Sequence, residues 1–142
     1  MEDRRAMPAS VLRLRGLSVL LVDDDEDELN LLGSLLTQAG AEVTAVSTVE
    51  AALRALAERV RDVLVSDLAM KGHDGFTLIR RIRRLPRDRG RDMPCVAMSA
   101  FVGTRRLREQ VLAAGYTDFL AKPVHDRIVD TLGALARQPT RA

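Results

Sequence analysis

The chain has 142 residues, of which 46% are hydrophobic and 30% charged, and its formal net charge is +2. This is the size of one ordinary domain, with enough apolar material for a core. A single cysteine, Cys95, excludes an internal disulfide and a cysteine-based zinc site. No apolar run approaches the roughly 18 residues that a membrane span needs. We therefore expect a soluble, cytoplasmic domain.

Residues 1–16 contain four arginines, Pro8 and Gly16, and they follow neither a helical nor a strand periodicity. This pattern predicts a flexible leader or linker. The folded domain is expected to span residues 17–137, followed by a short tail over 138–142.

From Leu17 onward, short apolar runs alternate with segments of helical periodicity. After the first run, for example, Leu29, Leu32 and Leu36 recur at helical spacing and Gly40 marks a stop. The five runs predicted as strands are 17–22, 42–46, 62–66, 94–98 and 117–120. Strands that alternate with helices in this way favour the α/β class, as one open parallel sheet covered on both faces, a doubly wound arrangement.

Polar residues follow the predicted strands. The first run is followed by Asp23–Glu26 and the third by Asp67, while Ser99 and Lys122 come after the fourth and fifth. Because ligand sites of such sheets lie beyond the carboxyl ends of the strands, these side chains are expected in one crevice. Clustered carboxylates without His or Cys favour a hard cation, Mg²⁺ above all. An acidic first loop would repel a flavin phosphate, and the sequence has neither a GxGxxG nor a GxxxxGK[ST] pattern.

Four motifs at these strand ends resemble the receiver domain of two-component response regulators. The resemblance covers about residues 17–137, and the motifs are Val22–Asp24, Ser66–Gly75, Met98–Ala100 and Ala121–Pro123. Each motif alone is weak, but together and in this order they form a specific signal. The resemblance implies a flavodoxin-like sheet with strand order 2-1-3-4-5 and a phospho-accepting signalling function.

The resemblance also implies roles for individual residues. Asp67 would be the phospho-acceptor, a carboxylate nucleophile that forms an acyl phosphate. Asp23, Asp24, Asp67 and the backbone carbonyl of Ala69 would hold Mg²⁺. Lys122 would pair with the phosphoryl oxygens and Ser99 would donate a hydrogen bond to one of them.

Two further positions would be structural, and two would form a switch. Gly75 and Pro123 are expected to shape the site, Pro123 through a cis Lys122–Pro123 bond. On phosphorylation, Ser99 would move toward the phosphoryl group and Phe119 would turn inward. The surface of the fourth helix, fifth strand and fifth helix would then change for a partner. This surface includes Arg105, Arg106, Arg108, His125, Arg127 and Asp130.

The implied partners are a histidine kinase or histidine phosphotransfer domain, a downstream effector protein, and a second copy of the chain in a phosphorylation-dependent homodimer. The family catalyses only its own phosphorylation and dephosphorylation, so we do not expect an enzyme in the usual sense. Nucleic acid is not an expected partner, since the arginine-rich stretch Arg80–Asp92 lacks aromatics and reads as a solvated helix end and loop.

Several residues have a simpler interpretation. Asp25, Glu26 and Asp27 fit a helix start, where acids are favoured, and Cys95 fits a buried apolar position. Lys71, His73 and His125 are interpreted as exposed. Ala69 and Phe101 occupy positions that tune the lifetime of the phosphoryl group in the family, and as apolar residues they predict a long-lived phosphorylated form.

Two alternatives stay open. The domain could be free-standing, which the initial Met1 and the short tail favour, or it could be a receiver cut from a hybrid histidine kinase, with residues 1–16 as the interdomain linker. It could also be a scaffold that keeps the receiver fold and signals without phosphorylation. The presence of Asp23, Asp24, Asp67, Ser99 and Lys122 argues against the scaffold.

Overall fold

The fold is a five-stranded parallel sheet with the strand order β2-β1-β3-β4-β5. The structure, a computed structural model, describes residues 13–70, 74–100 and 105–136. The strands are β1 (Ser18–Val22), β2 (Glu42–Val46), β3 (Val63–Asp67), β4 (Cys95–Ser99) and β5 (Asp118–Ala121). The predicted α/β class and strand order are thus confirmed.

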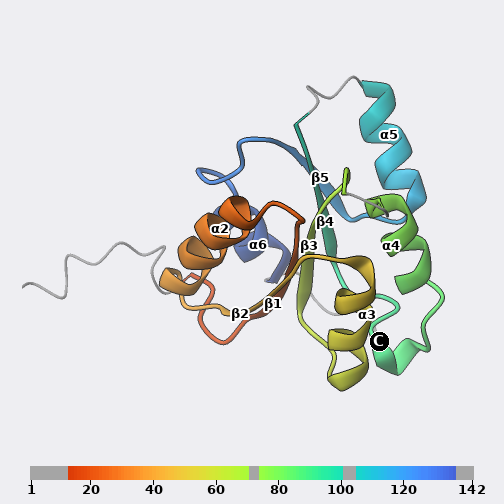
Figure 1. The fold of residues 1–142 in the computed structure, drawn as a ribbon, viewed down its shortest axis with the longest axis horizontal. Helices are drawn as coiled ribbons and strands as arrows, with labels where there is room; N and C mark the ends of the chain where they lie inside the picture. Colours follow the sequence, from red (N-terminus) through yellow and green to blue (C-terminus); the bar gives the residue numbers. More distant parts are fainter. Residues whose placement is uncertain (1–12, 71–73, 101–104, 137–142) are drawn as a thin grey trace, which may run out of the picture.

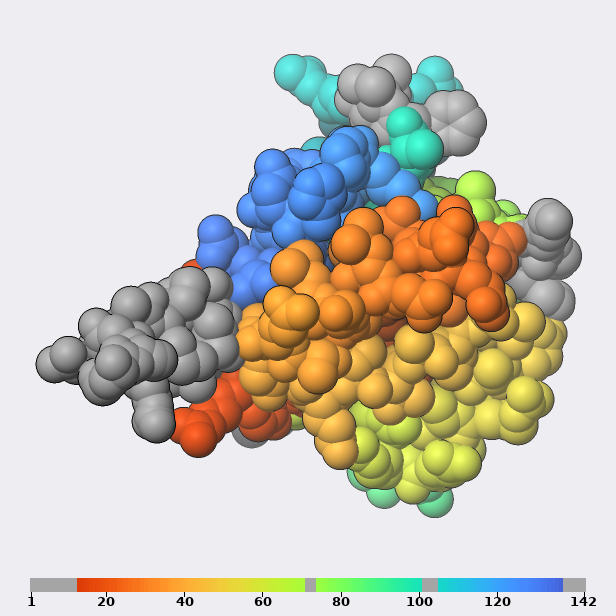
Figure 2. Space-filling model, turned by 60° about the vertical axis from the view of Figure 1, so that its left-hand side comes forward, coloured from red at the N-terminus to blue at the C-terminus, as the bar shows by residue number. Residues whose placement is uncertain are grey.

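Helices cover both faces of the sheet (Figure 1). They are α2 (Glu26–Gln38), α3 (Val49–Glu58), α4 (Gly75–Ile82), α5 (Arg105–Ala114) and α6 (Ile128–Ala136), with a short 3₁₀ helix η2 (Arg87–Arg89). On one face lie α2 and α6, and on the other lie α3, α4 and α5. Figure 2 shows α2, in orange, beside the blue segment that includes α6.

The strands bury alternate residues in two separate cores. In β1, Leu20 and Val22 pack with α3 and α4, while Val19 and Leu21 pack with α2 and α6. All residues of β1, β3 and β4 are buried, which is why their sequences read as continuous apolar runs. Cys95 belongs to this interior, where burial raises the pKa of its thiol to about 12 and keeps it neutral.

Side-chain caps set the starts of three helices. Asp25, Thr48 and Asp74 accept hydrogen bonds from backbone N–H groups in the first turns of α2, α3 and α4. After α5, Gly115 adopts a φ of +126°, a conformation that favours glycine and allows the chain to turn directly into β5.

Some strand boundaries differ from the predicted ones. The strands β3, β4 and β5 each begin and end one residue later than predicted, so Asp67 and Ser99 are the last residues of their strands. Val60 lies beyond the end of α3 and is 44% exposed. The helix ends before it because Arg59 is extended, and the next residue, Arg61, is buried.

The packed structure also begins before position 17. Leu14, within the segment predicted to be a flexible leader, is 1% exposed and its N–H donates to the Ala39 carbonyl. Arg13 forms an ion pair of 2.6 Å with Asp130 in α6. Residues 13–16 are therefore part of the domain, while residues 1–12 lie outside the described part. None of the helices within the described ranges has the length and apolar character of a membrane span.

Candidate functional site

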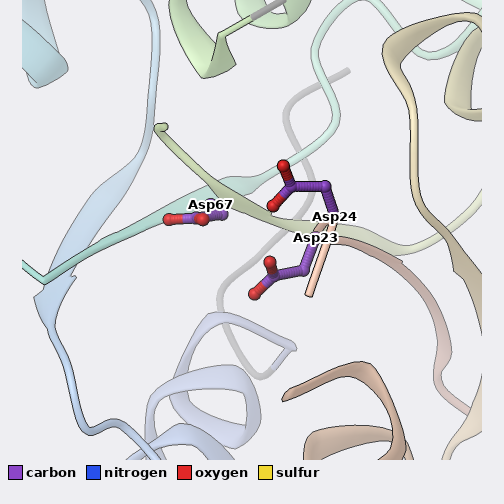
Figure 3. Close-up of side chains that lie close together, drawn as sticks. All are labelled: Asp23, Asp24 and Asp67. Atoms are coloured by element: carbon purple, nitrogen blue, oxygen red, sulfur yellow. The ribbon is translucent and has the colours of Figure 1, made fainter. Parts of the chain in front are cut away.

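Three carboxylates meet where β1 and β3 end. Val22 of β1 pairs with Ser66 of β3, so the residues that follow, Asp23 and Asp67, lie next to each other. Each of Asp23, Asp24 and Asp67 offers an oxygen, and these oxygens all lie within 4.8 Å of one another. Figure 3 shows the three side chains gathered at this edge of the sheet.

Lys122 brings a positive charge to this cluster from the other side. Its ammonium nitrogen lies 3.4 Å from Asp23 Oδ2 and 3.5 Å from Asp67 Oδ1. The register places it there, because Ala121 pairs with Ser99 and the Lys122 N–H donates to the Ser99 carbonyl at 2.8 Å. The structure thus brings together the five residues predicted from the strand ends, with Ser99 at 4% exposure.

Burial dominates the electrostatics of the site. Asp23 is fully buried and Asp67 is 7% exposed. Burial raises the pKa of Asp67, the Lys122 ammonium opposes this increase, and Asp23 adds to it. Burial lowers the pKa of Lys122, but the carboxylates Asp67 and Asp23 outweigh it, so the pKa is raised overall. The cluster therefore holds more negative charge than one lysine neutralises, which suits a divalent cation.

Local hydrogen bonds keep the carboxylates in place. The Asp25 N–H donates to Asp23 Oδ1 at 3.0 Å, and the Asp25 carboxylate caps α2 through the N–H groups of Asp27 and Glu28. A backbone hydrogen bond from Ala69 reaches the Asp67 carboxylate. Asp25 thus has the helix-start position predicted for it, and Asp23 and Asp24 face the site.

The loop after β3 is closed at its base by Gly75. The Gly75 N–H donates to the Leu68 carbonyl at 2.7 Å, and the Leu68 N–H donates to the Met98 carbonyl at 2.9 Å. A β-carbon on Gly75 would lie 2.8 Å from the Asp67 carbonyl oxygen and 2.9 Å from the Tyr116 hydroxyl. No other residue type fits there without a backbone shift.

The segment after β5 is also held by its own chain. The Lys122–Pro123 peptide bond is cis, and the Arg127 guanidinium donates to the carbonyls of Ala121 and Pro123. These two carbonyls flank Lys122. Arg127, predicted as part of the partner surface, thus also holds the backbone around Lys122, a contact that no sequence pattern indicates.

Among the described residues, the side chains that could hold a cation here all offer oxygen. Three carboxylates without imidazole or thiolate fit Mg²⁺, which prefers oxygen ligands and retains water. Asp23, Asp24 and Asp67 are the residues placed to hold it. The carbonyl of Ala69 stays a predicted further ligand. Lys71, His73 and Phe101 lie outside the described residues.

The predicted switch residue Phe119 is buried in the core in this structure. Its ring is 7% exposed and packs in the core cluster on the α3–α4–α5 face. Arg108 of α5 donates to the Phe119 carbonyl at 3.3 Å, which links the predicted partner surface to β5. His125 is exposed, in agreement with its simpler interpretation.

A pocket of about 820 Å³ opens at the opposite edge of the sheet, where the strands begin. Asp62 and Arg83 line it, but both have partners within the chain. Asp62 accepts from the N–H and hydroxyl of Ser18, and Arg83 donates to three backbone carbonyls. The charges of Asp62 and Arg83 thus serve the fold.

Comparison with known proteins identifies the family. Residues 19–132 match the response regulator receiver domain. The chain is 40% identical over 111 residues to an "uncharacterized 14.6 kDa protein in sodA1 3'region" of Leptolyngbya boryana, covering 78% of this chain and 82% of that protein. It is 37% identical over 127 residues to the sensory/regulatory protein RpfC of Xanthomonas campestris pv. campestris, covering 87% of this chain but only 17% of RpfC.

A solved structure agrees. The receiver domain of the sensor histidine kinase PA1611 from Pseudomonas aeruginosa PAO1, determined with a magnesium ion coordinated in its active site cleft, matches with a TM-score of 0.75 and 28% identity. The match covers 87% of this chain and 99% of that domain. The carboxylates at the ends of β1 and β3 are therefore the acidic pocket of a phosphorylation-dependent signalling domain, and the chain belongs to the response regulator receiver domain family.

Proposed function

We propose that Asp67 receives a phosphoryl group from a phosphohistidine donor in a reaction that requires Mg²⁺. The observation that carries this proposal is the geometry around Asp67. Its carboxylate lies beside Asp23 and Asp24 and within 3.5 Å of the Lys122 ammonium. One of its oxygens would form the new bond to phosphorus, while the bond between phosphorus and the donor imidazole nitrogen breaks and its electrons return to the imidazole.

Each residue has a part in this step. Bound Mg²⁺ would neutralise the charge on the phosphoryl oxygens. Asp23 and Asp24 would hold the cation, with Ala69 adding its carbonyl. Lys122, now shared between Asp23 and Asp67, would turn to the phosphoryl group and stabilise its spread-out charge. Ser99 would donate its hydroxyl to a phosphoryl oxygen.

The output would pass through α5, β5 and α6. Because the ring of Phe119 is already buried, we propose that phosphorylation stabilises this inward arrangement rather than creating it. The Arg108 bond to the Phe119 carbonyl would carry the change to the arginine-rich face of α5. The reader of this surface would be an effector protein or a second phosphorylated copy of the chain.

The donor would be a histidine kinase or a histidine phosphotransfer domain in the cytoplasm. We propose either a free-standing domain or a receiver within a hybrid histidine kinase, since the chain spans 82% of the Leptolyngbya relative but under a fifth of RpfC. In neither case does the domain act on a separate substrate. It catalyses only the gain and loss of its own phosphoryl group.

The test is incubation with a small phosphodonor and Mg²⁺, followed by mass spectrometry. We expect the mass of one phosphoryl group on the wild type and none on Asp67→Asn. A mass gain that is also seen with Asp67→Asn would show that another residue is the phospho-acceptor. No gain on either protein, with Mg²⁺ present, would favour the phosphorylation-independent scaffold.

A further inference from the structure

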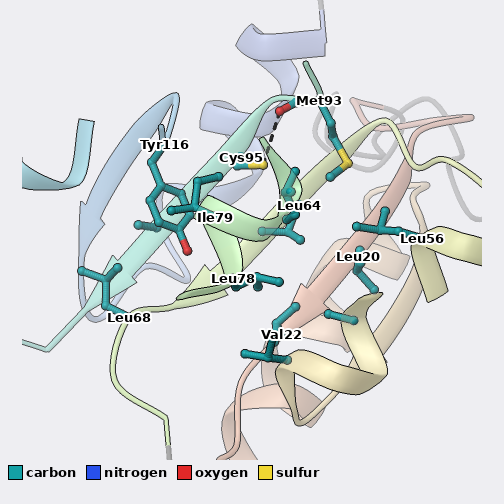
Figure 4. Close-up of a cluster of buried hydrophobic side chains, with 14 of the residues drawn as sticks. Leu20, Val22, Leu56, Leu64, Leu68, Leu78, Ile79, Met93, Cys95 and Tyr116 are labelled. Carbon is teal, nitrogen blue, oxygen red and sulfur yellow. Dashed lines mark hydrogen bonds between the residues drawn. The ribbon is translucent and has the colours of Figure 1, made fainter. Parts of the chain in front are cut away.

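Tyr116 is the single tyrosine of the chain and stands two residues before β5. It is 4% exposed, and Figure 4 shows its ring beside Ile79 with the hydroxyl directed into the apolar cluster. A hydroxyl in such surroundings destabilises the fold unless it is hydrogen-bonded. Here it donates to the Gly75 carbonyl at 2.7 Å, across 41 sequence positions.

This bond acts on the backbone that closes the loop after Asp67. Gly75 contacts Leu68 through its N–H, at 2.7 Å, and its Cα faces the Asp67 carbonyl so closely that a β-carbon would lie 2.8 Å away. The same Asp67 carbonyl accepts the Ser66 hydroxyl at 2.9 Å. Because no space separates Gly75 from the backbone of Asp67, a displacement of one is transmitted to the other.

We propose that Tyr116 is a positioning residue for the phospho-acceptor site, which rests on the function proposed for Asp67. Its hydroxyl holds Gly75, and Gly75 holds both ends of the loop that carries Ala69. The loop thus keeps the Asp67 carboxylate and the Ala69 carbonyl in the arrangement that receives Mg²⁺. Tyr116 itself touches neither the cation nor the phosphoryl group.

The variant Tyr116→Phe removes the hydroxyl and keeps the ring in the core. We expect its dissociation constant for Mg²⁺, measured by calorimetric titration, to rise roughly tenfold, the lower end of the loss when a group that orients a metal ligand is removed. The phosphorylation rate with a small phosphodonor should fall at low Mg²⁺ and return close to the wild-type rate at saturating Mg²⁺. If Tyr116 had a purely structural role, the phosphorylation rate would not recover at saturating Mg²⁺.

Thr117→Val is the matched control. It removes the neighbouring hydroxyl, which accepts the Cys95 N–H at 3.0 Å and does not contact the loop. Both variants should lower the melting temperature by a few degrees, but Thr117→Val should bind Mg²⁺ as tightly as the wild type. Wild-type affinity in Tyr116→Phe, or an equal loss in Thr117→Val, would overturn the proposal. If the wild type takes no phosphoryl group from the phosphodonor, the proposed function of Asp67 is wrong. The Mg²⁺ titration of Tyr116→Phe then still shows, separately, whether Tyr116 positions the cation site.

Discussion

The ammonium nitrogen of Lys122 lies 3.5 Å from Asp67 Oδ1, yet the pKa of Asp67 is raised, not lowered. Burial of the carboxylate is the larger effect, and the neighbouring Asp23 acts in the same direction. The folded domain without a cation therefore carries an ionised group that it stabilises less well than water does. The ionised Asp67 carboxylate therefore lowers the free energy of unfolding of the domain without a cation.

We predict that Asp67→Asn stabilises the domain at neutral pH when Mg²⁺ is absent. A group whose pKa is raised by folding contributes stability that is fully present below its unfolded pKa and is lost as the pH rises through its folded pKa. Asparagine has no ionisable carboxyl group, so the variant does not lose stability as the pH rises. Thermal unfolding in EDTA should show a melting temperature higher by roughly 2–5 °C at about pH 7.

The gain from Asp67→Asn should shrink as the pH falls through the raised pKa of folded Asp67 and be lost below the unfolded pKa, where the wild-type carboxyl is protonated in both states. Adding Mg²⁺ should reverse the order of the two proteins, since the cation binds the wild-type folded state more tightly. A variant that is less stable than the wild type at neutral pH in EDTA would show that the ion pair with Lys122 outweighs burial.

Asp74 has the opposite pH dependence. Its carboxylate accepts the Thr77 N–H at 2.9 Å at the start of α4, and this bond lowers the pKa of Asp74. Its stabilising contribution is therefore present above the unfolded pKa and is lost as the pH falls through the folded pKa. We expect Asp74→Ala to lower the free energy of unfolding by about 1 kcal/mol at neutral pH.

Asp74→Asn is the control for this helix cap, since asparagine also accepts the Thr77 N–H but carries no charge. Chemical denaturation should show near wild-type stability for Asp74→Asn with a flatter dependence on acid pH. If Asp74→Ala and Asp74→Asn lose the same free energy, the charge rather than the cap would be the source of stability.

Gly75→Ala should be strongly destabilising because the new methyl group would lie 2.8 Å from the Asp67 carbonyl and 2.9 Å from Leu68 Cα. Overpacking against backbone costs about 1–3 kcal/mol or more. Gly33→Ala in α2 has nothing within 4 Å of the new carbon and should gain about 0.5–1 kcal/mol from helix propensity. Urea unfolding of both variants compares the two effects, and equal stabilities would contradict the close contact at Gly75.

Arg83 is half-buried in a stretch of mostly exposed arginines. Its guanidinium donates to the carbonyls of Gly115, Arg91 and Met93 at 2.7 Å, and so joins the end of α4 to the turns before β4 and β5. Lysine cannot supply this planar fork. We expect Arg83→Lys to lose roughly 2 kcal/mol in denaturant unfolding, while Arg84→Lys at the exposed neighbouring position changes less than about 0.5 kcal/mol. A loss for Arg83→Lys as small as that for Arg84→Lys would mean that a positive charge without the planar fork is sufficient at position 83.

The apolar runs were sufficient to predict the sheet, because a strand buried on both faces leaves a continuous pattern. The acids that follow these runs were sufficient to predict the cluster of Asp23, Asp24 and Asp67, because parallel strands end at one edge. Leu14 was misjudged, because whether an isolated apolar residue is buried depends on what packs against it, here the apolar cluster on the α2–α6 face that includes Ala39.

The sequence by itself determined the succession of strands and helices along the chain, because this follows from local periodicity. It also determined the chemistry at the strand ends and the family, because these follow from residues at fixed positions relative to each strand. Only the tertiary structure decided which contacts cross between elements. The bond from Tyr116 to Gly75, the fork of Arg83 and the raised pKa of Asp67 all depend on distances between segments far apart in the chain. Such distances are set by side-chain packing, which no pattern along one strand or helix contains.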